Sequence, residues 1–146
     1  MSLASGFESA EESPGLLLWQ VTNRWQAAQR AALKPYDLTH VQFVLLAALT
    51  YLQADGPVTQ KSLADLAATD PMMTSQVLRA LEGRGLAHRP AHPTDRRARA
   101  VAATEAGRDL ANRAVVAVEA CDAAFFASLG DDLPAFTEGL RALRQS

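Results

Sequence analysis

The sequence predicts a mainly α-helical protein with one small β-hairpin, and two observations lead to this fold class. Over most of the 146 residues, apolar side chains recur at spacings of three and four, which is the period of an amphipathic helix. Between residues 86 and 102 that period is lost, and two short stretches alternate around a run of turn residues, as the strands of a hairpin do. We therefore expect four helices, a hairpin and two further helices, in that order.

The first two helices have clear start signals. Ser13 and Pro14 suit the N-cap and the first position of a helix that runs to about residue 35. Thr39 and Gln42 form a capping box that opens a second helix. Apolar residues cover most of the surface of this second helix, so we expect it to be the most buried helix of the fold.

Two short helices joined by a tight turn follow the turn at residues 55–57. Thr59 caps the first of them, and Asp70 caps the second, which has Pro71 at its first position. Gly85 supplies the stop at its end. The second helix has a polar outer face, so the pair predicts a helix-turn-helix.

The hairpin and two more helices complete the chain. Residues 86–90 and 97–102 supply the alternating strands, and the basic turn between them forms the tip. Thr104 caps a long helix and Gly130 ends it, and Asp131 or Asp132 then starts a last helix with an apolar stripe. A helix-turn-helix followed by a hairpin is a winged helix-turn-helix domain, which we place at residues 36–103.

The two ends of the chain contain more apolar helix than a winged domain of this size needs for its own core. We expect residues 13–35 and 104–146 to be dimerisation helices, because packing against a second copy would bury them. A monomer that folds these helices back on itself is the alternative. Residues 1–12 are small, polar and acidic and predict a disordered tail. The dimer contacts that we expect are Leu17, Val21, Leu133, Phe136, Leu140 and Leu143.

Composition limits the compartment and the chemistry. The sequence shows neither a membrane-spanning run nor a signal peptide, so we expect a cytoplasmic protein. Cys121 is the only cysteine, which excludes an internal disulfide and a multi-thiolate zinc site. His40, His88 and His92 follow no ligand spacing, and the glycines form no phosphate-binding loop. The sequence therefore predicts no metal, no cofactor and no enzymatic activity.

Charge is distributed unevenly along the chain. The net charge is −2, but residues 79–99 contain six arginines against two acids, a local charge of +4 that leaves −6 for the remainder. A basic patch on an acidic body suits an anionic partner such as double-stranded DNA. A solvated run of charges is the alternative.

Four stretches resemble the MarR-type transcriptional regulators. Residues 70–86 (DPMMTSQVLRALEGRGL) resemble the recognition helix of that family, and residues 93–99 (PTDRRAR) resemble its wing, with an Asp-x-Arg core. Residues 104–108 (TEAGR) are similar to the start of its long dimerisation helix, and residues 38–45 match the start of its second helix. The resemblance implies a homodimeric regulator, usually a repressor, that binds a short pseudo-palindromic operator with its two recognition helices in successive major grooves.

The resemblance also implies a set of DNA contacts. On the recognition helix we expect Gln76 to contact adenine and Arg79 to contact guanine or a phosphate, whereas the start of the preceding helix suits phosphates. Met72 and Met73 depart from the family pattern of small hydroxyl residues, and they predict either contacts to thymine methyl groups or packing inside the turn. Glu82 is expected to form a surface ion pair. The expected contacts are Thr59, Gln60, Ser62, Met72, Ser75, Gln76, Arg79, Asp95, Arg96, Arg97 and Arg99.

The wing supplies the last four of these contacts. Arg97 corresponds to the arginine of the Asp-x-Arg core, which enters the narrow minor groove, while Asp95 steadies the loop. Arg96 and Arg99 suit phosphates, and the alternative for Arg99 is a position on the sheet face beside an acid.

The family commonly binds a small lipophilic or aromatic effector between the dimerisation helices and the winged domain, which releases DNA by changing the spacing of the recognition helices. Trp19, Trp25, Phe43 and Tyr51 are candidates for lining such a cleft, and packing is the alternative for each. Cys121 lies in an apolar stripe, so we do not expect thiol sensing. A winged helix that contacts only proteins is the alternative function, and an activator has the same sequence pattern as a repressor.

Overall fold

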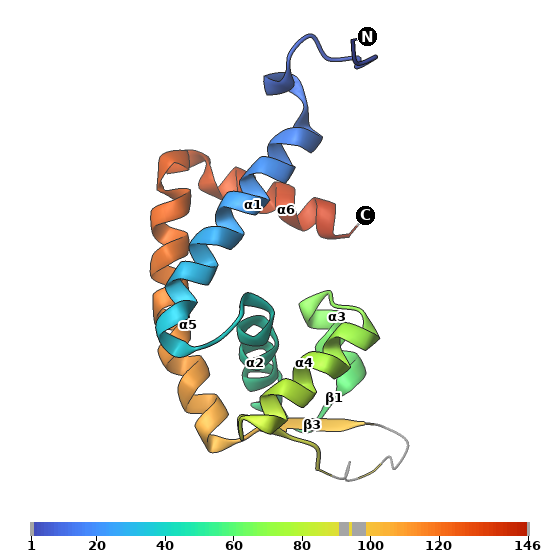
Figure 1. Cartoon of the computed structure of the whole chain (residues 1–146), viewed down its shortest axis with the longest axis vertical. Coiled ribbons are helices and arrows are strands. Elements are labelled where there is room, and N and C mark those ends of the chain that lie inside the picture. The colour runs from blue at the N-terminus through green and yellow to red at the C-terminus, as the bar shows by residue number, and fades with distance from the viewer. Residues whose placement is uncertain (1, 91–93, 95–98, 146) are drawn as a thin grey trace.

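The computed structural model describes residues 2–90, 94 and 99–145 and shows a helical molecule with a small sheet at one end (Figure 1). This confirms the mainly α fold class with a hairpin. The helices are α1 (Pro14–Leu33), α2 (His40–Gln53), α3 (Gln60–Ala67), α4 (Pro71–Gly83), α5 (Glu105–Phe126) and α6 (Leu133–Arg144). The strands are β1 (Val58–Thr59), β2 (Ala87–His88) and β3 (Ala100–Ala103), and short 3-10 turns cover Ala10–Glu12, Lys34–Tyr36 and Ala127–Asp132.

Side-chain caps start the main helices at the predicted positions. The Ser13 hydroxyl accepts from the Leu16 amide, and Thr39 and Gln42 form the expected capping box. An Asp70 carboxylate oxygen accepts from the Met73 amide at 2.8 Å at the start of α4. Such caps satisfy amides that have no partner within the helix, which is why these positions were visible in the sequence.

The helix ends differ in detail from the sequence expectation. α1 ends at Leu33, and Pro35 lies inside the 3-10 turn, where a proline near the start of a helical turn leaves no hydrogen bond unmade. α5 ends at Phe126, before the expected stop at Gly130, and Gly130 lies inside the following 3-10 turn with a positive φ of 53°. The side chain of Asp132 does not cap α6, which instead has a proline in its first turn.

The sheet contains one strand that the sequence did not predict. β3 lies in the middle, with β1 and β2 antiparallel to it on either side. Val58 lies opposite Val101, and Ala87 lies opposite Ala103. β1 is only two residues long, too short to show an alternating pattern, so only its pairing with β3 reveals it.

The core of the winged domain is built around α2, which packs against α1, α3, α4, α5 and β3. Leu45, Leu46 and Leu49 are fully buried on it. The core continues along α5 through Leu110 and Ala114. One hydrophobic core therefore joins the winged domain to the long helix that leaves it.

The start of α5 lies very close to Gly85 and Leu86, the two residues that precede β2 and lead into the wing. The Thr104 amide donates to the Leu86 carbonyl at 3.0 Å, and the Thr104 hydroxyl donates to the Gly85 carbonyl at 2.7 Å. A Cβ atom at Gly107 would lie 2.0 Å from the Leu86 carbonyl oxygen, so only glycine allows this approach. The base of the wing is thereby held against α5.

Candidate nucleic-acid interface

The outer face of α4 carries four of the side chains expected to read DNA. Met72 is 72% exposed, Gln76 and Arg79 are exposed, and Ser75 is half-buried. An Arg79 guanidinium nitrogen donates to the Ser75 hydroxyl at 3.3 Å. The opposite face of α4 is buried, so the helix is anchored on one side and open on the other.

The two methionines at the start of α4 both lie at the surface. Met73 is 43% exposed and Met72 more so. Neither methionine is therefore buried inside the turn, which was the alternative considered from the sequence. Two exposed apolar side chains at the start of this helix are available for contacts with an apolar group of a partner.

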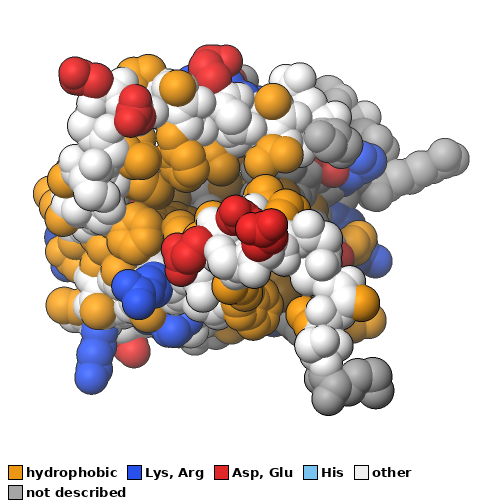
Figure 2. All heavy atoms as spheres, turned by 90° about the horizontal axis from the view of Figure 1, so that it is seen from above, with side chains coloured by type: hydrophobic (Ala, Val, Ile, Leu, Met, Phe, Trp, Pro, Cys, Tyr) orange, Lys and Arg blue, Asp and Glu red, His pale blue; other side chains and the backbone are white. Residues whose placement is uncertain are grey.

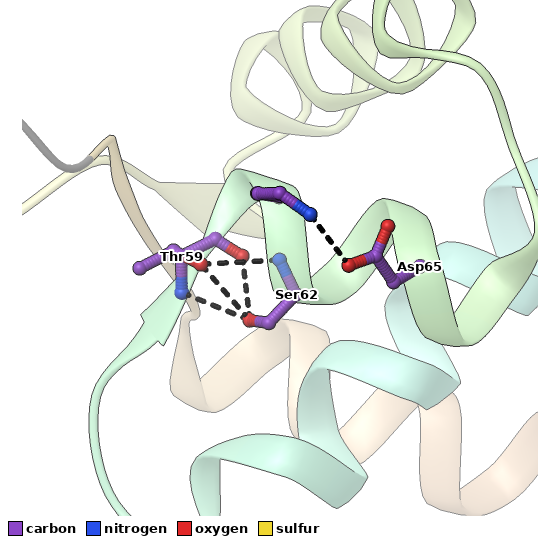
Figure 3. Close-up of polar contacts among 4 residues, drawn as sticks. Thr59, Ser62 and Asp65 are labelled. Atoms are coloured by element: carbon purple, nitrogen blue, oxygen red, sulfur yellow. Dashed lines mark hydrogen bonds and ion pairs between the residues drawn. The ribbon is translucent and has the colours of Figure 1, made fainter.

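The start of α3 is closed by a local hydrogen-bond network (Figure 3). The Ser62 amide donates to the Thr59 hydroxyl at 3.1 Å, and the Ser62 hydroxyl donates to the Thr59 carbonyl at 2.9 Å. One turn along, the Lys61 ammonium lies 3.0 Å from a carboxylate oxygen of Asp65. The hydroxyl groups expected to meet phosphates thus already cap their own helix, while Thr59 is half-buried and Ser62 is exposed.

Gln60 does not lie where the sequence suggested. Its side chain was expected to contact a phosphate, but the residue is 8% exposed. Its side-chain oxygen accepts from an Arg89 guanidinium nitrogen at 3.3 Å, and its backbone amide donates to the Arg99 carbonyl at 2.7 Å. The structure therefore gives Gln60 an internal role. These contacts come from residues on either side of the wing, far from Gln60 in the chain, and the sequence did not reveal them.

The tip of the wing lies outside the described residues, and with it the predicted contacts Asp95, Arg96 and Arg97, as well as His92. Arg99, the remaining predicted contact of the wing, is exposed just before β3. It lines a groove of about 600 Å³ together with residues of α3 and the start of α4. Arg99 thus lies on the same side of the domain as the starts of both helices of the helix-turn-helix.

Two arginines of the basic patch are paired with acids. The Arg89 Nε atom lies 2.5 Å from a carboxylate oxygen of Glu82, which confirms a surface ion pair for that acid. Arg84 donates to the Asp37 carbonyl at 2.6 Å and lies 3.7 Å from its carboxylate. The sequence identified Arg89 only as part of a charge run, because its partner lies seven residues away on a different element.

Comparison with known proteins decides the family. The model of the MarR family matches residues 38–98. The uncharacterized HTH-type transcriptional regulator YdcH of Bacillus subtilis is 45% identical over 129 residues, which cover 88% of this chain and 88% of that protein. The chain belongs to the MarR family. It is therefore a DNA-binding transcriptional regulator and not an enzyme.

Two further relatives extend the MarR comparison. The HTH-type transcriptional repressor Rv2887 of Mycobacterium tuberculosis is 37% identical over 121 residues, covering 82% of this chain and 85% of that protein. The crystal structure of CouR from Rhodococcus jostii RHA1, bound to p-coumaroyl-CoA, has a TM-score of 0.84 at 29% identity and covers 94% of this chain and 96% of that chain. Rv2887 has also been solved in complex with salicylic acid, with a TM-score of 0.68 at 33% identity, covering 92% of this chain and 99% of that chain.

A polar cluster lies between α1, α5 and the start of α2 in this MarR-family chain. The Trp25 indole donates to an Asp122 carboxylate oxygen at 2.9 Å, and the Gln29 amide donates to the same oxygen at 2.7 Å. Gln29 is fully buried, and among the described residues its side-chain oxygen has no hydrogen-bond partner. The cluster thus holds a buried acceptor that is free to receive a hydrogen bond.

His40 borders this cluster, with its ring edge-on to that of Trp25 at 5.0 Å between centroids. Burial lowers the pKa of His40 below its ordinary value of 6.5, while nearby Asp122 acts to raise it and Arg30 to lower it. Burial is the largest of these effects. The described residues contain no group of three His, Cys, Asp or Glu side chains that could hold a metal ion.

The four aromatic residues proposed for an effector cleft are not gathered in one place. Phe43 is 6% exposed and belongs to the hydrophobic core. Trp19 and Tyr51 are exposed, at 69% and 71%. Tyr51 lies eleven residues after His40 on α2. It is therefore roughly 16 Å along the helix axis from the histidine that borders the polar cluster. Of the four, only Trp25 belongs to the polar cluster.

The predicted dimer contacts all lie at the surface. Hydrophobic side chains gather over the end of the molecule that contains the start of α1 and α6 (Figure 2). None of the described residues of α6 is buried, although it has a hydrophobic stripe. The six residues are exposed by 36–64%: Leu17, Val21, Leu133, Phe136, Leu140 and Leu143.

Across residues 2–90, 94 and 99–145, no helix has both the length and the hydropathy needed to cross a membrane.

Proposed function

We propose that this chain is a homodimeric repressor that reads a pseudo-palindromic operator with α4 and the wing and releases it when an aromatic effector binds. The observation that carries the proposal is the outer face of α4, where Met72, Gln76 and Arg79 are exposed on a helix whose other face is buried. A rigid helix with adaptable polar side chains on its open face suits readout in the major groove.

The proposed contacts divide by groove. Gln76 contacts adenine, and Arg79 contacts guanine or a phosphate, while Met72 meets a thymine methyl group. Arg97 enters the minor groove, and Arg96 and Arg99 contact phosphates beside it. Thr59 and Ser62 present the start of α3 to the backbone, with Ser75 beside them on α4, and Asp95 steadies the wing. Gln60 is left out of this set because it is buried.

A second copy of the chain completes the molecule. The apolar stripe of α6 and the start of α1 are exposed together, and isolated amphipathic helices are marginal in water without a partner surface. We assign residues 13–35 and 104–146 to the dimer and residues 36–103 to DNA binding. The two-fold symmetry of such a dimer matches the symmetry of a pseudo-palindromic operator. A regulator acts where its DNA lies, so the protein works in the cytoplasm.

The repressor and effector parts of the proposal rest on relatives. Rv2887 is named a repressor, and it was solved with salicylic acid, while CouR was solved with p-coumaroyl-CoA. Both ligands carry an aromatic ring. In this chain the polar cluster beside Trp25 contains a buried acceptor on Gln29, which suits a ligand with a hydroxyl or amide donor. We place the effector there, between the dimerisation helices and the winged domain.

The proposal is tested by fluorescence anisotropy with the DNA upstream of this gene and a scrambled control across a salt series. Operator binding roughly a thousandfold tighter than the control, falling steeply as salt rises, supports a specific regulator. Arg79→Ala should weaken operator binding by about 1–3 kcal/mol. The matched control is Arg113→Ala on α5, which removes the same charge from an exposed position outside the proposed contacts and should bind like the wild type.

Two outcomes oppose the proposal. Equal and weak binding to the upstream DNA and to the scrambled control, together with no sequence enriched from a random pool, favours the winged helix as a protein-interaction module.

Release of DNA by salicylate or p-coumarate supports the effector site, and Gln29→Leu should reduce that release while leaving DNA binding in place. Release that is equally efficient in the variant would remove the polar cluster from the mechanism.

A further inference from the structure

Arg89 sits at the base of the wing, directly after β2, and its guanidinium group lies between the last turn of α4 and the start of α3. Its Nε atom lies 2.5 Å from a carboxylate oxygen of Glu82 in the last turn of α4. One of its terminal nitrogens donates to the side-chain oxygen of Gln60 at the start of α3, at 3.3 Å. The two side chains of the ion pair are only 29% and 34% exposed. One arginine therefore joins the recognition helix, the helix before it and the wing.

The same network reaches the other end of the wing. The Gln60 amide donates to the carbonyl of Arg99, the residue that precedes β3, at 2.7 Å. Arg89 and Arg99 are thus both tied to Gln60, one through its side chain and one through its backbone. The two points where the wing leaves and re-enters the domain are held relative to each other and to α4.

We propose that Arg89 is a positioning residue, which with Glu82 and Gln60 forms a brace that sets the wing relative to the recognition helix. The inference rests on the proposed DNA contacts of α4 and the wing, and it assigns Arg89 no contact of its own with DNA. Two groups that must enter a major and a minor groove at the same time need a fixed separation. A planar guanidinium with several donors can hold two partners at once in one geometry.

The charge of Glu82 makes the proposal easy to distinguish from simple electrostatics. An acid on the recognition helix repels a polyanion, so its removal should tighten DNA binding if its charge were all that mattered. The brace predicts the opposite for the specific complex. Glu82→Gln should weaken binding to a duplex selected by the wild-type protein from a random pool by about three- to tenfold. Binding to a scrambled duplex should be unchanged or slightly tighter.

Arg89 variants supply an independent readout. Arg89→Ala should weaken binding to the selected duplex, but the slope of log K against log salt should stay that of the wild type, because no phosphate contact is lost. Arg89→Lys keeps the charge but not the fork of donors, so it should behave like Arg89→Ala. The double variant Glu82→Arg with Arg89→Glu should recover much of the selected-duplex affinity, since the reversed pair can again join α4 to the wing.

The charge control is Glu119→Gln, which removes an exposed acid from α5 and should leave both duplexes bound as before. Circular dichroism and thermal unfolding at fixed protein concentration check that every variant folds. Glu82→Gln that binds the selected duplex as tightly as the wild type, or a salt slope reduced by about one in Arg89→Ala, would overturn the brace. Failure of the wild type to enrich any sequence would instead refute the proposed sequence-specific function, and the brace with it.

Discussion

Replacing Gly107 with alanine should destabilise the protein, although alanine is the better helix former. Gly107 lies in the first turn of α5, where that helix passes the entry to the wing. A Cβ atom there would lie 2.0 Å from the carbonyl oxygen of Leu86, 3.0 Å from its carbonyl carbon and 3.3 Å from a methyl group of Leu46. The two nearest atoms belong to backbone, so no side-chain rotation can relieve the overlap.

The expected change in the free energy of unfolding combines one stabilising effect and two destabilising effects. Alanine gains about 1 kcal/mol over glycine inside a helix. Forcing the backbone apart costs about 1–3 kcal/mol in a well-packed region. Moving the Leu86 carbonyl also weakens the hydrogen bond that it accepts from the Thr104 amide, which is worth about 1 kcal/mol. We therefore expect Gly107→Ala to lower the free energy of unfolding by about 1–3 kcal/mol.

Urea unfolding followed by circular dichroism measures this change, with protein concentration held constant because a dimer's stability depends on it. The matched control is Gly83→Ala at the end of α4, where the added Cβ meets nothing within 4 Å beyond its chain neighbours and its own helix backbone. That control should be as stable as the wild type or more stable by up to about 1 kcal/mol. A Gly107→Ala protein at least as stable as the wild type would refute the close approach of α5 to Leu86.

Three further predictions test the dimer, the polar cluster and the wing. Leu140→Glu, which places a charge on the exposed stripe of α6, should shift the protein from dimer to monomer in sedimentation and weaken operator binding; an unchanged dimer would contradict the assigned interface. Burial lowers the pKa of His40, so the imidazole takes up a proton more readily in the unfolded chain than in the folded protein. The free energy of unfolding should therefore fall as pH drops below 6.5, and it should fall less in His40→Gln. A variant with the same pH dependence of thermal unfolding would exclude His40 as the cause. Arg97→Ala should weaken operator binding by about 1–3 kcal/mol in anisotropy titrations and keep the dimer intact, and unchanged affinity would remove the wing from the mechanism.

Local signals accounted for most of what the sequence revealed. The caps at Ser13, Thr39, Asp70 and Thr104 act within three residues of themselves, so each helix start could be predicted without knowledge of the fold. The helical period likewise placed the polar residues of α4 on one face and its apolar residues on the other. The fold class, the helix-turn-helix and the exposed face of the recognition helix follow from such short-range patterns.

The candidate site was less completely predictable. Glutamine usually lies at the surface, so nothing in the sequence indicated that Gln60 is buried. In the fold it is hydrogen-bonded to Arg89 through its side chain and to Arg99 through its backbone. Phe43 and Tyr51 look equivalent as aromatic candidates, yet one is in the core and the other in solvent. Which face of a helix meets which neighbour depends on packing between elements, and no pattern within one helix records it.

By itself, then, the sequence determined where most of the helices begin, which of their faces are apolar, where positive charge is concentrated and which family the chain resembles. The tertiary structure alone decided the pairing of β1 with β3, the contact of Gly107 with Leu86 and the ion pair between Glu82 and Arg89. The physical reason is range. Caps and periodicity express energies between residues a few positions apart, whereas these contacts form only when the whole core has brought separate elements together.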